Sequence, residues 1–446
     1  MSPLLTGWGR TAPSAATVVE AGVADLPDVL RGRPARGVIA RGLGRSYGDA
    51  AQNAGGTVLA PIAGPTTITR SDDGTALVTA AAGTSVHELI GSLLAEQLFV
   101  PVTPGTRYVT LGGAVAADIH GKNHHRDGSF ADHVVELDLV TPDGQRRTVG
   151  PHVDPELFWA TVGGMGLTGV ITRVAFQALP VESAYLTVRT ERVDGLETLV
   201  RTMREHDDEF RYSVAWIDTL ARGRALGRSV LTRGDHSTAS ELTGAPSRDR
   251  WRPPANPRLG VPLTPPVGLV NRLGVRAFNG LWYRKAPRDR VDLQTIPSFF
   301  HPLDQVQGWN RLYGRSGLVQ YQLVVPDAAE AAIAEALRLL SGAGQPSFLA
   351  VLKRFGCGNP GLLSFPMPGW TLALDLPAGP ALAPLFRNLD ELVVAAGGRL
   401  YLAKDSRLSP ETFDRMYERA DEFRKLRREL DPDGVIQSDL ARRLHL

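Results

Sequence analysis

Short apolar runs bounded by turn residues dominate the chain between residues 36 and 180. They are rich in valine and have the length of buried strands. Turn signals such as Asp73-Gly74 separate them, and a helical spacing runs from Ser85, a good N-terminal cap, to Leu94. The strands that this pattern predicts lie at 37–40, 76–79, 134–140 and 169–176.

Longer amphipathic helices enter the pattern after about residue 184. The spacing predicts helices over Glu197–His206 and Ala328–Leu340, with a strand over Leu318–Val325 before the second one. Residues 244–270 are proline-rich and are predicted to be irregular. The last predicted helix is Ser409–Glu429, and four side chains define its buried side: Phe413, Met416, Tyr417 and Phe423.

Length and composition favour a two-domain α+β protein. The chain has 446 residues, which exceeds the size of one ordinary core. A hydrophobic content of 43% and a charged content of 22% are typical of soluble globular proteins, and a net charge of +2 gives no general attraction to nucleic acid. The single cysteine, Cys357, excludes an intrachain disulfide and a cysteine-built zinc site.

The sequence offers no membrane-spanning or export signal. No apolar run has the length needed to cross a bilayer, and the first residues lack a basic region followed by an apolar one. We therefore expect a cytoplasmic protein. A local exception to the near-neutral total is 250–290, where nine basic side chains and one acidic one, Asp289, are mixed with apolar residues. This segment predicts either peripheral contact with an anionic membrane or a loop at the mouth of a pocket.

Lysine is rare in this chain. Of 49 basic residues only five are lysine, namely Lys122, Lys285, Lys353, Lys404 and Lys425. Arginine therefore supplies positive charge wherever charge alone is needed. Because a desolvated lysine can lose its proton and an arginine cannot, a lysine inside a motif is a candidate for a chemical role.

The first chemical motif is the glycine-rich segment Ala40–Asp49, which directly follows a predicted strand. Three glycines and a serine within it suit a tight loop whose N–H groups turn toward a phosphate. An ordinary glycine-rich turn is the alternative for this segment taken alone.

The second motif, Pro104–His125, combines a glycine pair with a cluster of polar side chains. Gly112-Gly113 allows close approach of a ligand, and the apolar stretch after it leads to a group of histidines. We disfavour a metal site, since no carboxylate stands at ligand spacing. For His124 and His125 the alternative is a structural role: a histidine in the core or at a helix end whose ring nitrogens already have hydrogen-bond partners.

The third motif contains glycines with the spacing of a dinucleotide-binding fingerprint, at Gly164, Gly166 and Gly169. A strand rather than a helix is predicted after it, and no suitable acidic residue follows at the required distance. We therefore reject a nicotinamide site here.

In this order the three motifs resemble the FAD-binding half of the vanillyl-alcohol-oxidase flavoproteins, of the p-cresol methylhydroxylase (PCMH) type. The resemblance implies a two-domain FAD-linked oxidase fold: a PCMH-type FAD-binding domain plus a substrate domain built on an antiparallel sheet. Further segments are similar to the decaprenylphosphoryl-β-D-ribose 2′-oxidase family. They are Thr6–Pro13, Asp118–His125, Leu281–Lys285, Phe300–Asp304, Gln320–Gln322, Leu363–Trp370, Gly398–Arg407 and Ser438–Arg443.

This resemblance implies a reaction and a partner. The family oxidises the 2′-hydroxyl of a decaprenylphosphoryl ribose to a ketone, the first half of epimerisation to decaprenylphosphoryl arabinose for cell-wall arabinan. An NAD(P)H-dependent keto-reductase, a separate protein, would complete the epimerisation. The implied domains are an FAD-binding domain at 1–183, a substrate-binding domain at 184–398 and a C-terminal segment, 399–446, that returns to the FAD domain.

The resemblance also assigns residues, with no metal among them. Lys404 and His120 are the expected catalytic residues. The expected FAD-binding positions are Ala40, Arg41, Gly42, Leu43, Gly44, Arg45, Ser46, Tyr47, Gly48, Asp49, Gly105, Thr110, Leu111, Gly112, Gly113, Ala117, Asp118, Ile119, His120, Ile171 and Tyr401. The expected substrate-binding positions are Lys122, Trp216, Gln320, Gln322, Lys353, Thr371, Ala373 and Lys404.

Some of these residues have plainer alternatives. Lys404 could form a surface ion pair with Asp405, Lys353 could be a solvated edge charge, and Trp216 and His120 could be packing residues. Gln320 and Gln322 alternate on one predicted strand, so both side chains should face the same side.

One departure concerns the link to FAD. Many flavoproteins of this superfamily bind FAD covalently through a histidine that precedes the loop serine. Arg45 stands there in this chain, so we expect non-covalent FAD.

Two other functions stay open at this point. One is oxidation of a soluble alditol or aldonolactone by the same fold, and the other is a flavin-binding subunit that only supports its partner.

Overall fold

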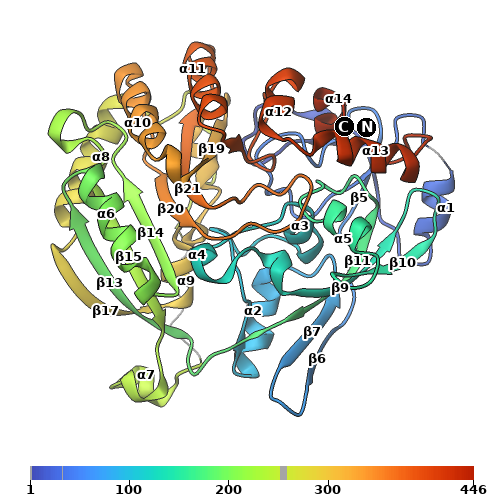
Figure 1. Cartoon of the computed structure of the whole chain (residues 1–446), viewed down its shortest axis with the longest axis horizontal. Coiled ribbons are helices and arrows are strands. Elements are labelled where there is room, and N and C mark those ends of the chain that lie inside the picture. Colours follow the sequence, from blue (N-terminus) through green and yellow to red (C-terminus); the bar gives the residue numbers. More distant parts are fainter. Residues whose placement is uncertain (1–2, 33, 252–258) are drawn as a thin grey trace.

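The structure is a computed structural model that describes residues 3–32, 34–251 and 259–446. Figure 1 shows two parts side by side: a first part made from the N-terminal region and the C-terminal end, and a second part built on one large sheet. Both chain ends lie close together on the first part.

The first part holds two main sheets. A parallel sheet has the order β3-β5-β4, with β3 at Thr17–Val19, β5 at Thr57–Leu59 and β4 at Val38–Ala40. An antiparallel sheet has the order β10-β9-β11-β7-β6, with β10 at Arg146–Val149, β9 at Val134–Val140, β11 at Val170–Gln177, β7 at Ala76–Ala81 and β6 at Thr66–Arg70. The inward side chains of the antiparallel sheet share one core with helices α2 (Val86–Ala95) and α3 (Leu111–Ala116).

Smaller elements complete the first part. They are the strand pairs β1 (Leu4–Leu5) with β2 (Ser14–Ala15) and β8 (Leu98–Phe99) with β12 (Leu179–Pro180), and the helices α1 (Leu26–Arg31), α4 (His124–Asp127) and α5 (Pro155–Thr161).

The second part is an eight-stranded antiparallel sheet with the order β17-β13-β15-β14-β20-β21-β19-β22. Its strands are β17 (Asp289–Thr295), β13 (Tyr185–Val193), β15 (Ser229–His236), β14 (Tyr212–Ile217), β20 (Ala350–Phe355), β21 (Gly369–Pro377), β19 (Leu318–Pro326) and β22 (Arg399–Leu400).

Alternation along these strands divides the sheet into two faces. Side chains such as Leu231, Leu352 and Leu374 pack with helices on one face. Those helices are α6 (Leu196–His206), α10 (Ala331–Ala343) and α11 (Leu382–Ala395). The opposite face, which carries Gln320 and Gln322, lines a large cavity. The expected α+β fold with an antiparallel-sheet second domain is confirmed.

The C-terminal segment leaves the large sheet and returns to the first part. Arg399–Leu400 still pairs with β19, so the last strand of the sheet lies just beyond the proposed boundary at 398. Further on, Ile436 pairs with Val38, and the helix α14 (Asp439–Leu444) caps the N-terminal region. The domain ranges themselves stay a proposal.

Most predicted elements match the structure, and one helix differs. Ser85 caps α2 with a reciprocal pair of hydrogen bonds to Glu88. The predicted single helix over Ser409–Glu429 is wrong, because the chain forms α12 (Pro410–Met416) and α13 (Ala420–Leu430). The break turns the Tyr417 hydroxyl to the Leu400 carbonyl oxygen, which it meets at 2.6 Å. Phe413, Met416, Tyr417 and Phe423 are nevertheless all buried.

The segment between β15 and β17 is only partly irregular. It contains α7 (Ala245–Arg248), the strand β16 (Leu259–Gly260) that pairs with β18 (Val306–Gln307), and the helix α8 (Arg272–Lys285). The part of the expected irregular region at 252–258 lies outside the described residues. The helix α9 (Ile296–Phe300) follows β17. None of the helices in the described ranges is long and apolar enough to cross a membrane.

Candidate active site

The predicted glycine loops and the free face of the large sheet enclose one cavity of about 1070 Å³. This volume exceeds the range of about 300–1,000 Å³ typical of sites for one drug-sized molecule. The cavity is therefore large enough to hold a cofactor and a substrate together.

The first loop forms one end of this cavity, which Ala40 to Gly48 line without interruption. Gly44 has a positive φ of 66°. Among the described residues, none accepts a hydrogen bond from the N–H groups of 42–46. A Cβ at Gly42 would lie 2.4 Å from Thr110 Oγ1, so only glycine fits there. A run of free N–H groups in a glycine-formed cradle fits a pyrophosphate.

Arg45 lies in the same loop, with its guanidinium 4.0 Å from the centre of the Trp8 ring and 5.2 Å from that of Tyr108. Asp49, at the end of the loop, does not line the cavity. Its carboxylate pairs with Arg443 at 2.7 Å and so ties the loop to α14.

The second loop contributes through helix α3. Thr110 caps the helix by accepting a hydrogen bond from Gly113 N at 3.2 Å, and a Cβ at Gly112 would lie 3.0 Å from that of Ala82. The expected positions that line the cavity here are Gly105, Thr110, Gly112, Gly113, Ala117, Ile119 and His120. Leu111 instead points into the core.

Asp118 is also absent from the cavity wall. It is buried with a φ of 40°, and its carboxylate accepts hydrogen bonds from Ser129, Asn359 and Ser364. Burial raises the pKa of Asp118 to about 6, and these hydrogen bonds oppose the shift. Because Asn359 and Ser364 belong to the β20–β21 connection, Asp118 joins the two parts of the molecule.

His120 is part of the cavity wall. Gln322 Nε2 donates to His120 Nε2 over 2.8 Å, while His120 Nδ1 has no hydrogen-bond partner among the described residues. Burial, with Lys353 as the next cause, holds the pKa of His120 well below its ordinary value. The imidazole is therefore neutral. Because Nε2 accepts the hydrogen bond from Gln322, the ring proton is on Nδ1, which can donate a hydrogen bond to a bound ligand.

Lys404 meets a buried carboxylate that the sequence analysis did not select. Its Nζ lies 4.2 Å from the centre of the Tyr47 ring. Burial lowers the pKa of Lys404 to about 8, and Asp375 opposes the shift. Lys404 is a half-buried residue of the cavity wall, and Asp405 pairs with Arg443 instead. The alternative of a Lys404–Asp405 surface pair is wrong.

Asp375 stands directly opposite Gln320 in the β19–β21 pairing. Gln320 Nε2 donates to Asp375 Oδ1, and burial raises the pKa of this carboxyl to about 7. A signal for it was present, since Asp375 has the same strand parity as Ala373 and Thr371, which were selected.

Two further lysines line the same cavity. Lys353 Nζ lies 3.5 Å from the Gly121 carbonyl oxygen, and Lys122 Nζ donates to the Phe299 carbonyl above the Phe299 ring. Burial lowers the pKa of each to about 7; Lys404 adds to this at Lys353, and Lys353 adds to it at Lys122. Because Lys353 faces the cavity from β20, an interior strand of the sheet, a solvated edge charge is excluded.

Lys285 also lines the cavity, so four of the five lysines meet there. The fifth, Lys425, is exposed on α13. The cavity wall is therefore rich in partly neutralised ammonium groups, which suits an anionic ligand.

The remaining expected residues lie around this centre. Trp216 lines the cavity and donates its indole N–H to the Phe348 carbonyl at 2.9 Å. Ala373 and Ile171 also line it, whereas Thr371 lies behind Gln322, whose Nε2 it meets at 3.3 Å.

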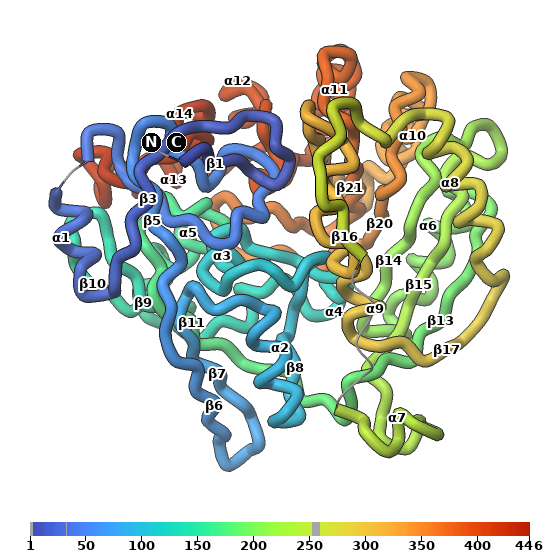
Figure 2. Tube along the Cα trace, turned by 180° about the vertical axis from the view of Figure 1, so that it is seen from behind, coloured from blue at the N-terminus to red at the C-terminus, as the bar shows by residue number. Residues whose placement is uncertain are grey.

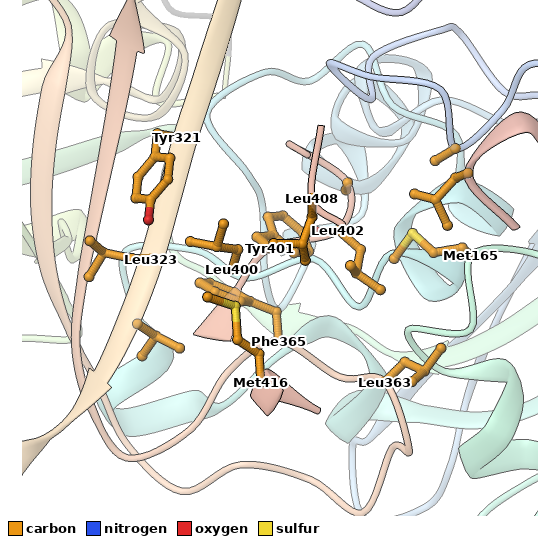
Figure 3. Close-up of a cluster of buried hydrophobic side chains, with 14 of the residues drawn as sticks. Met165, Tyr321, Leu323, Leu363, Phe365, Leu400, Tyr401, Leu402, Leu408 and Met416 are labelled. Carbon is orange, nitrogen blue, oxygen red and sulfur yellow. The ribbon is translucent and has the colours of Figure 1, made fainter. Parts of the chain in front are cut away.

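Tyr401 joins the cavity to the core shown in Figure 3, where its ring stacks on Phe365 with ring centres 4.8 Å apart. The Tyr401 hydroxyl donates to the Ala117 carbonyl at 2.6 Å and so fixes the returning C-terminal segment beside α3.

The histidines that suggested a metal site make other contacts in the structure. His124 packs on Phe355 with ring centres 4.3 Å apart, and His125 Nε2 lies within 3.2 Å of two carbonyl oxygens, those of Asp207 and Phe210. Within the described ranges no group of three or more possible protein ligands could hold a metal ion.

Comparison with protein families gives two matches. Residues 15–150 match the model of an FAD binding domain, which confirms FAD as the cofactor. Residues 376–444, which include Tyr401 and Lys404, match the model of D-arabinono-1,4-lactone oxidase.

Comparison with individual proteins extends the similarity to the whole chain. The decaprenylphosphoryl-β-D-ribose oxidase of Mycolicibacterium smegmatis is 44% identical over 453 residues, covering 99% of this chain and 97% of that protein. An L-gulono-1,4-lactone dehydrogenase of Mycobacterium tuberculosis is 24% identical over 100% of this chain and 99% of its own length. Cytokinin dehydrogenase 4 of Arabidopsis thaliana is 35% identical over 30% of this chain and 27% of its own.

Proposed function

The chain belongs to the decaprenylphosphoryl-β-D-ribose oxidase family, and we propose that it oxidises the 2′-hydroxyl of decaprenylphosphoryl-β-D-ribose to the 2′-ketone. The observation that carries this substrate is 44% identity over nearly the full length of both proteins. The reaction is the first half of an epimerisation that yields decaprenylphosphoryl arabinose for cell-wall arabinan.

The chemistry that bound FAD supplies is acceptance of the hydride from the carbinol carbon. This chain would hold the pyrophosphate on the free N–H groups of 42–46 and the flavin near His120 and Tyr401. Support comes from the glycine cradle around Gly42 and from the unpartnered Nδ1 of His120, which can donate a hydrogen bond to a bound ligand.

In this proposal Lys404 takes the proton of the 2′-hydroxyl at its Nζ. A base must be free to accept a proton near neutral pH, and a pKa of about 8 leaves part of the Lys404 population neutral. Asp375, with a pKa of about 7, can receive the proton in turn. Gln320 supports this step by holding one oxygen of Asp375.

Lys353 and Lys122 would bind the phosphate that joins sugar and lipid. Each has a pKa of about 7, so an arriving anion would draw a proton onto each amine and create a charge-assisted contact. Gln322 and Ala373 would border the ribose, and Trp216 would flank the path toward the lipid.

Two partners complete the proposal. The ketone needs an NAD(P)H-dependent keto-reductase, and the lipid tail favours peripheral contact with a membrane. Gly169 is followed by strand β11 rather than by a helix, which agrees with a hydride donor bound on a separate protein. The cytoplasmic location stays a prediction.

One other function also has a specific observation in its favour. The match of residues 376–444 to D-arabinono-1,4-lactone oxidase favours a soluble alditol or aldonolactone as the alternative substrate.

The deciding experiment mixes the FAD-loaded protein with prenylphosphoryl ribose without oxygen and follows the yellow flavin absorbance. Bleaching by this compound, and not by soluble alditols or aldonolactones, supports the proposal. Bleaching only by a soluble sugar would replace it with the alternative. A flavin that no sugar reduces would indicate a subunit without activity of its own.

A further inference from the structure

Apolar side chains gather on one exposed surface of the second part. Ten of the fifteen large apolar side chains that are exposed in the described residues fall between Leu259 and Leu293. We call this surface the apolar rim. Its six most exposed members, each between 62% and 80% exposed, are Leu259, Leu263, Val267, Leu269, Leu273 and Leu281. A concentration of this kind marks an interaction site rather than scattered surface residues.

Helix α8 presents this surface because only one of its sides is attached to the protein. Val275 and Asn279 are its buried residues, and Asn279 Nδ2 donates to Asp218 Oδ1 at 2.8 Å. The sides that carry Leu273 and Leu281 therefore face outward. Seen from behind in Figure 2, α8 and the edge strand β17 follow the same outer edge of the large sheet.

The cavity opens at the apolar rim. Phe278, Trp282 and Arg290 all line the cavity, and all three are exposed to solvent. A single space thus runs from the first glycine loop to the surface between α8 and β17. This step rests on the proposed function, which gives the substrate a long lipid tail. That tail would have to leave the cavity through this opening.

The rim also carries unpaired positive charge. Within the described ranges no ion pair involves Arg272, Arg276, Arg284, Lys285 or Arg288. The acidic residue beside them, Asp289, is already paired with Arg189 at 2.8 Å. Basic side chains around an apolar surface are the composition that binds an anionic lipid surface.

We propose that the apolar rim docks on an anionic lipid bilayer and so places the cavity opening at the layer in which a lipid-linked sugar is dissolved. Leu273 and Leu281 enter the acyl boundary, while Arg276 and Arg284 contact headgroup phosphates. The docked protein then takes its substrate from the bilayer without bringing the lipid tail into water.

The test measures binding of the FAD-loaded full chain to vesicles in the absence of substrate. Phosphatidylcholine vesicles with about a third phosphatidylglycerol should bind the protein, vesicles of phosphatidylcholine alone should bind it weakly, and added salt should release it. Arg276→Gln with Arg284→Gln should weaken binding about 25-fold, since each basic side chain near the surface contributes about fivefold. The matched control, Lys425→Gln with Arg428→Gln on α13, should bind normally.

A second pair of variants tests the apolar component. Leu273→Glu with Leu281→Glu should abolish vesicle binding, whereas Val153→Glu, at an exposed apolar position between β10 and α5 in the first part, should not change it. Flavin reduction by a water-soluble short-chain prenylphosphoryl ribose should be normal in all these variants. Failure of that reduction in the unmodified protein would reject the proposed function alone.

The membrane proposal is overturned by either of two results. One is vesicle binding that changes neither with added salt nor with the content of anionic lipid. The other is binding that the rim variants leave intact, which would show that the rim is not the surface that contacts the membrane.

Discussion

Lys404→Met tests the central chemical assignment, because it removes the amine while keeping a flexible side chain of similar length. General base catalysis contributes about 10²–10⁴-fold to a proton transfer. Lys404 is the half-buried amine that lies beside both Asp375 and the first loop. We therefore expect flavin reduction by prenylphosphoryl ribose to slow by about 10²–10⁴-fold.

FAD binding should survive the same change. No N–H group of the first loop depends on Lys404, and the contact that is lost is the one with the Tyr47 ring at 4.2 Å. Contacts of this kind contribute about 0.5–2 kcal/mol. Asp375 is left without its neighbouring cation, but its pKa is already about 7, so it can take up a proton instead of remaining as a buried charge.

The assay is anaerobic stopped-flow measurement of flavin reduction across pH. In the unmodified protein the rate should rise with pH and level off above about 8, the pKa of Lys404. Lys404→Arg should fail as Lys404→Met does, since a guanidinium does not release its proton at these pH values. Lys425→Met is the control and should behave as the unmodified chain. An active arginine variant, or a methionine variant within tenfold of normal, would refute the role of the amine.

Three further outcomes follow from the cavity. Acid precipitation should release free FAD and leave colourless protein, because Arg45 cannot form the covalent link; flavin retained in the pellet would contradict this. The folded-state pKa of Lys353 is about 7, below its ordinary 10.5, so FAD-free protein should gain stability as pH rises from about 7 to 10.5. Lys353→Met should reduce that rise and stabilise the protein near pH 7 in thermal unfolding, and an unchanged slope would count against a desolvated amine at this position. Ala373→Cys in a Cys357→Ser background should be labelled by a small electrophile only when the cavity is free of substrate, as intact mass would show; labelling that substrate does not slow would remove this position from the substrate site.

The sequence was informative wherever a local pattern sets the structure. The strand at 134–140 has the predicted bounds, since alternation and the turn after it act on neighbouring residues. Ser85 and Glu88 cap α2 by a purely local exchange of hydrogen bonds. The residues of the first loop could be selected because a cradle of free N–H groups needs glycines close together in the chain.

Residues that depend on strand pairing were harder to predict. Asp375 belongs to the site because β21 pairs with β19 in the register that sets it against Gln320. The sequence shows that Asp375 and Ala373 share one face of a strand. It does not show which residues of β19 lie opposite them. Thr371, which the resemblance assigned to the substrate, shares the same alternation but does not line the cavity; its hydroxyl accepts a hydrogen bond from Gln322 Nε2 instead.

Helix α8 was missed for a different physical reason. Gly274 and Gly280 lower its helix propensity, and apolar side chains occur on sides of the helix that face solvent. A pattern search expects those sides to be polar, and Leu273 and Leu281 do not meet that expectation. The feature that hid the helix from the pattern is the one that gives the rim its proposed function.

The use of lysine inside the cavity has a physical reason that the rest of the chain makes visible. Arginine supplies almost all positive charge elsewhere, but a guanidinium stays charged when it is buried. Lys122, Lys353 and Lys404 have pKa values of about 7, 7 and 8, so each can give up its proton while no anion is near. A cavity with three buried arginines would instead keep three desolvated charges, which folding would have to accommodate before any ligand arrived. With lysine, these three positions carry less than their full charge when the cavity is open, and they gain charge as a phosphate approaches. Lysine therefore combines a stable empty cavity with strong binding of an anion, which arginine at these positions would not allow.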